Sequence, residues 1–317
     1  MDVYLLVLLA IAVVGLAVTA GLSFVPAVQV WALERAGRRI GIGVPADLDP
    51  AFRRRMGRRI RASALGALAG LALGLLLAST VPGWGLPYSH RPILLAYYGV
   101  IAFGAVGSAV GVIVVSLASA PRPGDDAARV ARLTVTSVGD YIAPILRRLA
   151  LAASVCAVVT VGLAIALGGT SRVHLIVPGI VLVALAIAGQ IAFAVAARRI
   201  VAQGRPTRDT DEMVWDDALR WLALRDILSG PLQALCFGAF YGVLGTLNGP
   251  GALALITAFA SLVLVAVFNI ATRNNTDWFL LRLWPGARRR TDDEEAARLA
   301  AADPATAPWP DPSASHR

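Results

Sequence analysis

One stretch, residues 49–82, constrains the fold of this chain more than any other. Asp49 can cap a helix, and Pro50 suits its first turn, where a backbone N–H donor is not needed. Six arginines fill the next turns, at positions 53, 54, 55, 58, 59 and 61. Residues 62–81 then carry no charge, and about 20 apolar residues are enough to cross the core of a bilayer. The pattern predicts one helix that begins in water and ends in a membrane.

Glycines recur every four residues within this predicted helix, at Gly66, Gly70 and Gly74. This spacing places them on one helix face, where the missing side chains allow another helix to come close. We therefore expect these three glycines to form a helix-packing surface. Other glycine pairs, such as Gly107 and Gly111, are weaker indicators because a chain rich in Ala and Gly produces such spacing by chance.

The composition indicates an integral membrane protein. Of the 317 residues, 57% are hydrophobic and 15% are charged, whereas a soluble domain has about 45–50% apolar and 25% charged residues. The chain has no lysine, which excludes Schiff-base chemistry with retinal or pyridoxal and a P-loop. Cys156 and Cys236 both lie in apolar segments, so we expect them to be small core residues and not a disulfide.

Charge-free windows predict an all-α, polytopic transmembrane helical bundle with seven spans. The spans lie near residues 3–28, 62–81, 92–118, 149–167, 174–197, 231–247 and 252–270. The first window lacks a basic leading region and is long enough to span, so we expect no cleavable signal peptide. Residues 1–278 thus form a transmembrane domain. Residues 279–317 form a cytoplasmic juxtamembrane segment whose Pro-, Ala- and Ser-rich end is expected to be disordered.

The arginines predict the orientation of the bundle. The segments after spans one, three, five and seven hold 9, 5, 6 and 7 arginines, which is 27 of the 29 in the chain. Because cytoplasmic segments carry the excess of basic residues, the N-terminus is expected outside and the C-terminus inside. Since the net charge of +9 follows the membrane edge, it favours lipid headgroups over nucleic acid as its partner.

Each of the three inner loops passes a proline and acidic residues before a predicted helix. This shared plan has two open interpretations, an internal repeat of helical hairpins or the general way to restart a helix. In the third loop, residues 211–228 have Asp216, Asp217 and Arg220 opposite a broad apolar face. That helix would suit the membrane interface or a partner. The favoured alternative is an extension of the sixth span that packs on its neighbours.

No catalytic, cofactor-binding or metal site is predicted. The chain has no His-Glu-x-x-His motif. His90 and His174 at outer span ends lack a carboxylate partner for a metal. Among neutral polar groups inside the spans, the candidates to line a solute path are Gln190, Tyr97 and Tyr241. The alternative for Gln190 is a hydrogen bond between helices.

The segment after the seventh span has features of the headgroup layer. Trp278 and Trp284 suit that layer. Arg288, Arg289 and Arg290 follow and are expected to bind anionic lipid headgroups at the inner face.

Residues 196–220 carry two exit arginines, Pro206 and the run Asp-Asp-Ala-Leu-Arg at 216–220. In these features the chain resembles uncharacterised multi-pass integral membrane proteins of high-GC actinobacteria. The resemblance covers the inner loops and adjoining spans and implies a membrane fold without any particular activity. Seven spans with an outside N-terminus also resemble the plan of receptors and rhodopsins, but the missing lysine excludes a retinal pigment.

Three hypotheses for function follow. The first is a non-enzymatic plasma-membrane protein, either a component of a larger assembly or a permease-like bundle, with a protein partner at the cytoplasmic loops or a second copy of itself. The second is a transporter of a neutral or hydrophobic solute. The third is an enzyme acting on lipid at the inner face through Asp216, Asp217 or Asp140. A polar cavity within the membrane would favour the second, and a clustered acidic pocket the third.

Overall fold

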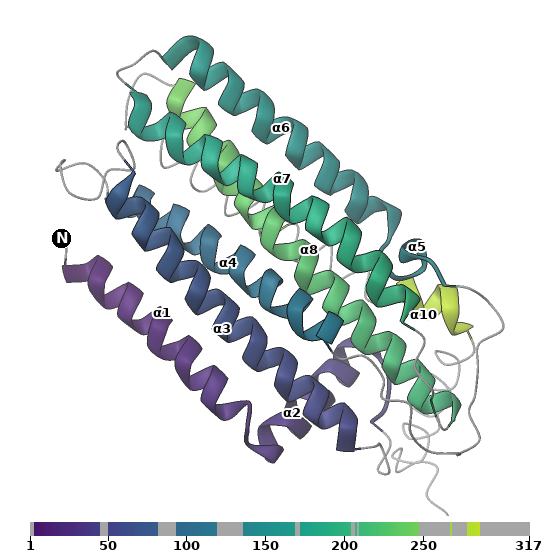
Figure 1. Ribbon diagram of the computed structural model, residues 1–317. Helices are drawn as coiled ribbons and strands as arrows, with labels where there is room; N and C mark the ends of the chain where they lie inside the picture. The colour runs from purple at the N-terminus through teal and green to yellow at the C-terminus, as the bar shows by residue number, and fades with distance from the viewer. Residues whose placement is uncertain are drawn as a thin grey trace, which may run out of the picture.

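The computed structural model describes residues 3–44, 50–81, 93–118, 136–168, 172–203, 207, 209–246, 267 and 278–285, without the side chains of residues 3–6 and 93–97. These residues form an all-α bundle (Figure 1). The helices are α1 (Val3–Leu22), α2 (Pro26–Ile40), α3 (Pro50–Thr80), α4 (Ile93–Ala118), α5 (Val138–Tyr141), α6 (Pro144–Gly168), α7 (Val173–Ala202), α8 (Thr210–Thr246) and α10 (Trp278–Leu283). The long helices run side by side, and α2, α5 and α10 lie at one end (Figure 1).

Five of the described helices are long and apolar enough to cross a membrane: α3, α4 over Tyr98–Ala118, α6 over Pro144–Leu167, α7 and α8. The pair α1 and α2 makes a sixth if it is counted as one broken span. The chain is therefore a multi-pass membrane protein by the length and composition of its helices. The predicted seventh span, 252–270, lies outside the described residues apart from Val267, so the count of seven stays a prediction.

The first predicted span, 3–28, is too long. Helix α1 ends at Leu22, and α2 leaves it at an angle of 101°. Pro26 accounts for the break, because the residue before a proline avoids the helical conformation and Val25 is extended (φ −77°, ψ 121°). Pro26 then occupies the first turn of α2.

Helix α8 is the centre of the bundle. Its 37 residues correspond to about 55 Å of helix at 1.5 Å per residue, and they pack against α4, α6 and α7. The favoured prediction of an extended sixth span is therefore correct, with the extension continuous through Pro231. The polar side of this helix is buried against its neighbours, since Asp216 and Asp217 are 3% and 2% exposed.

Helices α3 and α4 touch backbone to backbone. A methyl group on Gly66 would overlap the carbonyl oxygen of Gly107, and one on Gly70 would overlap that of Phe103. At Gly74 the methyl group would lie 3.0 Å from Cβ of Phe103. The three glycines thus lie on the α4-facing side of α3.

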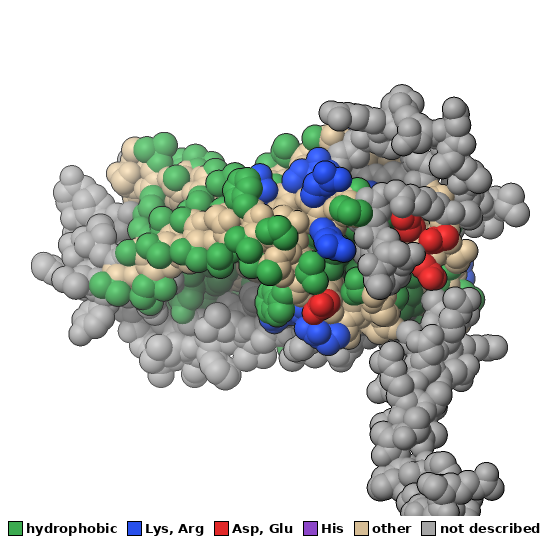
Figure 2. Space-filling model, turned by 90° about the horizontal axis from the view of Figure 1, so that it is seen from below, with side chains coloured by type: hydrophobic (Ala, Val, Ile, Leu, Met, Phe, Trp, Pro, Cys, Tyr) green, Lys and Arg blue, Asp and Glu red, His purple; other side chains and the backbone are tan. Residues whose placement is uncertain are grey.

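Large apolar side chains cover the outside of the long helices. Leu76, Leu151 and Ile191, on three different helices, are 57%, 66% and 62% exposed. Figure 2 shows such side chains over one end of a face, with charged side chains toward the other end. This apolar exterior fits the hydrocarbon of a bilayer, where the hydrophobic effect does not oppose exposed leucine and isoleucine.

Candidate functional site

The charged side chains of the described helices gather where α3 and α8 begin and where α4 and α7 end. We call this region the charged end. Arg35, Arg38 and Arg39 of α2 are exposed there. The first half of α8 brings acidic residues into the same region, and these are buried among the neighbouring helices.

Asp216 lies between two arginines at the charged end. One of its oxygens is 2.5 Å from Nη1 of Arg55 on α3, and the other is 2.6 Å from Nη2 of Arg220, one turn along α8. The side chains of Asp216 and Arg220 are only 4% and 12% exposed. A carboxylate is retained at such depth only with close cationic partners. The three side chains therefore fix the position of α3 against α8.

Asp217 joins α8 to two distant segments. It accepts hydrogen bonds from the Tyr141 hydroxyl at 2.6 Å and from Nε1 of Trp284 at 2.9 Å. Burial, together with the negative charge of Asp217, raises the pKa of Tyr141 to about 12. The hydroxyl therefore stays protonated and donates to the carboxylate at neutral pH. Asp217 also lies 3.8 Å from Arg220, which completes its surroundings with a cation.

The tryptophans predicted for the headgroup layer donate hydrogen bonds to polar groups of the protein. Trp284 donates to Asp217, and Nε1 of Trp278 donates to the Gly139 carbonyl oxygen at 3.0 Å. Beside them, burial acts to raise the pKa of Asp140, but hydrogen bonds from Ser137 and Arg282 outweigh it and hold this pKa below its usual value. The bonds from Trp278 to Gly139 and from Arg282 to Asp140 attach α10 to α5, which is far away in the sequence.

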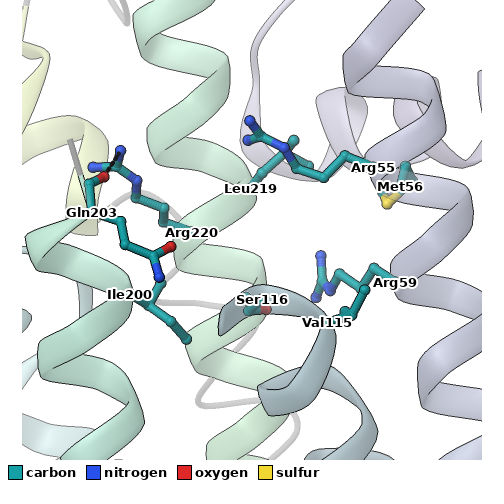
Figure 3. Close-up of a pocket in the computed structure, with 10 residues that line it drawn as sticks. Arg55, Met56, Arg59, Val115, Ser116, Ile200, Gln203, Leu219 and Arg220 are labelled. Atoms are coloured by element: carbon teal, nitrogen blue, oxygen red, sulfur yellow. Dashed lines mark hydrogen bonds between the residues drawn. The ribbon is translucent and has the colours of Figure 1, made fainter. Parts of the chain in front are cut away.

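A pocket opens between α3, α4, α7 and α8, next to these ion pairs (Figure 3). Its volume is about 40 Å³. The side chains that line it are Arg55, Met56, Arg59, Val115, Ser116, Ile200, Gln203, Leu219, Arg220 and Ala223. Arg55 and Arg59 extend from α3 toward α8 in Figure 3. Arg59 binds Asp226 at 2.5 Å and the Leu222 carbonyl oxygen at 2.6 Å.

Two of the residues predicted to line a solute path, Gln190 and Tyr241, are described, and they lie at different levels of the bundle. Gln190 donates to Ser154 Oγ at 2.8 Å, which links α7 to α6 as its alternative interpretation predicted. Tyr241 is 1% exposed and packs against Phe240. Gln190 is level with Pro231 of α8, because its neighbour Gly189 touches Pro231. Tyr241 lies ten residues beyond Pro231, which is about 15 Å further along the axis of α8.

Other predicted residues lie beyond the described part of the chain. Arg288, Arg289, Arg290 and His90 fall outside it, and the side chain of Tyr97 is not among those described. Within the described residues, no group of three His, Cys, Asp or Glu side chains could hold a metal ion.

Comparisons with known proteins found no relative of this chain. No protein-family model matches the chain, and no curated protein and no solved structure shows a significant match. The resemblance to actinobacterial membrane proteins stays a prediction. The site is therefore interpreted from its own residues.

Sequence reasoning missed the role of the charged end. The spacing of Asp216, Asp217 and Arg220 already indicates ion pairs one turn apart on a helix. The partner Arg55, 161 residues earlier, has no local signal. Only the packing of α3 on α4, and of α4 on α8, brings it to Asp216.

Proposed function

We propose that the chain is a non-enzymatic, multi-pass protein of the plasma membrane that serves as a membrane component of a larger assembly. In this proposal the charged end faces the cytoplasm and presents the binding surface for a protein partner. The 27 arginines expected on that side support the orientation. Anionic lipid headgroups would lie around the same edge of the bundle.

The observation that carries the proposal is the set of cross-links made by the first half of α8. Trp215 donates to the Gly43 carbonyl oxygen at 3.0 Å, Asp216 binds Arg55, and Asp217 binds Tyr141 and Trp284. Four segments that are far apart in sequence are thereby held in one arrangement. A fixed surface of this kind supports docking, because little conformational entropy is lost when a partner binds.

The other two hypotheses have less support from the geometry. Gln190 takes part in a contact between helices and Tyr241 is buried, so these two candidates for a solute path serve packing. Asp216, Asp217 and Asp140 each bind an arginine or a hydrogen-bond donor. Carboxylates held in this way support structure better than they support acid–base chemistry on a lipid.

Copurification tests this proposal. The full-length chain, tagged and extracted from its native membrane in mild detergent, should bring a partner in a fixed ratio, identified by mass spectrometry after chemical crosslinking. Arg38→Glu, which changes a side chain that is 66% exposed at the charged end, should reduce the partner's recovery. The control Thr80→Glu, at the other end of α3, should not. A folded chain that always migrates alone would contradict the assembly hypothesis.

A further inference from the structure

We propose that the pocket between α3, α4, α7 and α8 binds a phosphate group through the guanidinium groups of Arg55 and Arg59. The ligand class is a phosphate ester or free phosphate. The inference is independent of any protein partner, because it concerns a cavity inside the charged end and not its outer surface.

The charged side chains in the mostly apolar lining of the pocket are all cationic. Of the ten described residues that line it, three are arginines and none is acidic. Ser116 and Gln203 add neutral hydrogen-bonding groups. The three carboxylates that bind these arginines, Asp216, Asp217 and Asp226, are not among the lining residues. An anion in the pocket would therefore meet guanidinium groups without facing a carboxylate of the described lining.

The arginines keep donors for a ligand. A guanidinium group has five N–H donors. The polar contacts of Arg55 and Arg59 with described residues use only Nη1 of Arg55 and Nη2 of Arg59. Among described residues, Thr207 Oγ1 is the sole fully enclosed side-chain polar atom without a partner. The remaining guanidinium nitrogens of Arg55 and Arg59 are therefore not fully enclosed, and a ligand can reach them. Because Asp216 and Asp226 already hold the side chains in place, a ligand would bind preorganised donors.

The size of the pocket fits a single phosphate group. Its volume is about 40 Å³, and one water needs roughly 10–15 Å³ on the same measure. The space therefore holds about three waters, or a tetrahedral group of similar bulk. Met56, Ile200 and Leu219 form apolar walls of the pocket.

The position of the pocket along α3 allows two sources for the phosphate. Arg59 precedes the charge-free segment 62–81 by three residues, about 4.5 Å along the helix axis. This is the level at which lipid phosphates lie when residues 62–81 cross the hydrocarbon core. A lipid phosphodiester could enter from the side, and free phosphate could enter from the aqueous phase.

Binding measurements on the intact chain test the proposal. The purified protein is placed in nanodiscs of phosphatidylcholine and titrated with inorganic phosphate in one arm and with phosphatidylglycerol in the other. Arg59→Gln removes one lining cation, whose partner Asp226 is 43% exposed and so tolerates its loss. Ser116→Leu fills the pocket and keeps all three arginines. Arg38→Gln is the matched loss of an exposed arginine outside the pocket.

Saturable binding in either arm, weakened at least tenfold by both Arg59→Gln and Ser116→Leu but unchanged by Arg38→Gln, supports the pocket. Binding in the phosphate arm alone identifies a soluble ligand, and binding in the phosphatidylglycerol arm alone identifies a lipid. Absence of binding in both arms overturns the proposal. Binding that survives Ser116→Leu, or that falls equally with Arg38→Gln, also overturns it, because the charge of the surface alone would then explain it. Should Arg59→Gln fail to fold, Ser116→Leu decides the outcome.

Discussion

The close contact between α3 and α4 predicts that a side chain at Gly70 destabilises the fold. Replacing Gly70 by alanine places a methyl group against the backbone carbonyl of Phe103, with an overlap too large for a shift of a few tenths of an ångström. The atom in the way belongs to backbone, so no side-chain rotation can relieve the clash. The two helices must move apart, and the surrounding contacts along the interface are stretched.

The magnitude follows from two opposing effects. Overpacking in a close-packed interior costs about 1–3 kcal/mol, and a backbone clash belongs at the upper end of that range. Alanine is the better helix former by about 1 kcal/mol, which offsets part of the cost. Gly70→Ala should therefore lower the free energy of unfolding by about 2 kcal/mol. Gly162 on α6 has nothing within 4 Å of a methyl group, so Gly162→Ala should leave stability unchanged or raise it by up to about 1 kcal/mol.

Unfolding in mixed micelles, with a rising fraction of denaturing detergent and tryptophan fluorescence as the signal, measures both variants. The predicted result is opposite in sign for the two glycines, although the chemical change is identical. If Gly70→Ala were as stable as Gly162→Ala, the backbone contact between α3 and α4 would not exist in the membrane protein.

Three further predictions concern single polar groups. Asp216→Asn removes the buried carboxylate shared by Arg55 and Arg220, which are 24% and 12% exposed, and should destabilise the chain by about 3 kcal/mol in the same unfolding assay. Tyr141 should titrate near pH 12 in a difference absorbance titration against Tyr141→Phe. Since its pKa is raised in the folded state, the stability from its bond to Asp217 should be present below pH 10 and be lost as the pH rises toward 12. Gln190→Leu should cost only about 0.6 kcal/mol, the average for a hydrogen bond between membrane helices, as measured by unfolding.

The sequence predicts most of the helical architecture because membrane helices follow local rules. A run of apolar residues between arginines predicts α3 with few errors, and Gly70 falls on the face that meets α4. Pro26 indicates the break after α1. A search for apolar windows misses this break, because a single proline among apolar residues hardly changes the mean hydropathy of the window.

The charged end could not be predicted in the same way. Asp216 and Asp217 have the spacing of a solvated helix face, and their burial depends on cations supplied by other segments. Arg55 and Tyr141 reach them from positions 161 and 76 residues away. Local periodicity contains no information about such pairs. The pocket beside them therefore could not be predicted from the sequence either.

The most direct test of the central claim is the accessibility of single cysteines in intact cells. The claim is a membrane-spanning bundle whose charged end lies in the cytoplasm. In a background with Cys156→Ala and Cys236→Ala, cysteines are introduced by Arg38→Cys at the charged end and by Thr80→Cys at the other end of α3. A membrane-impermeant maleimide should label Thr80→Cys in intact cells and Arg38→Cys only after lysis. Labelling of Arg38→Cys in intact cells would contradict the account.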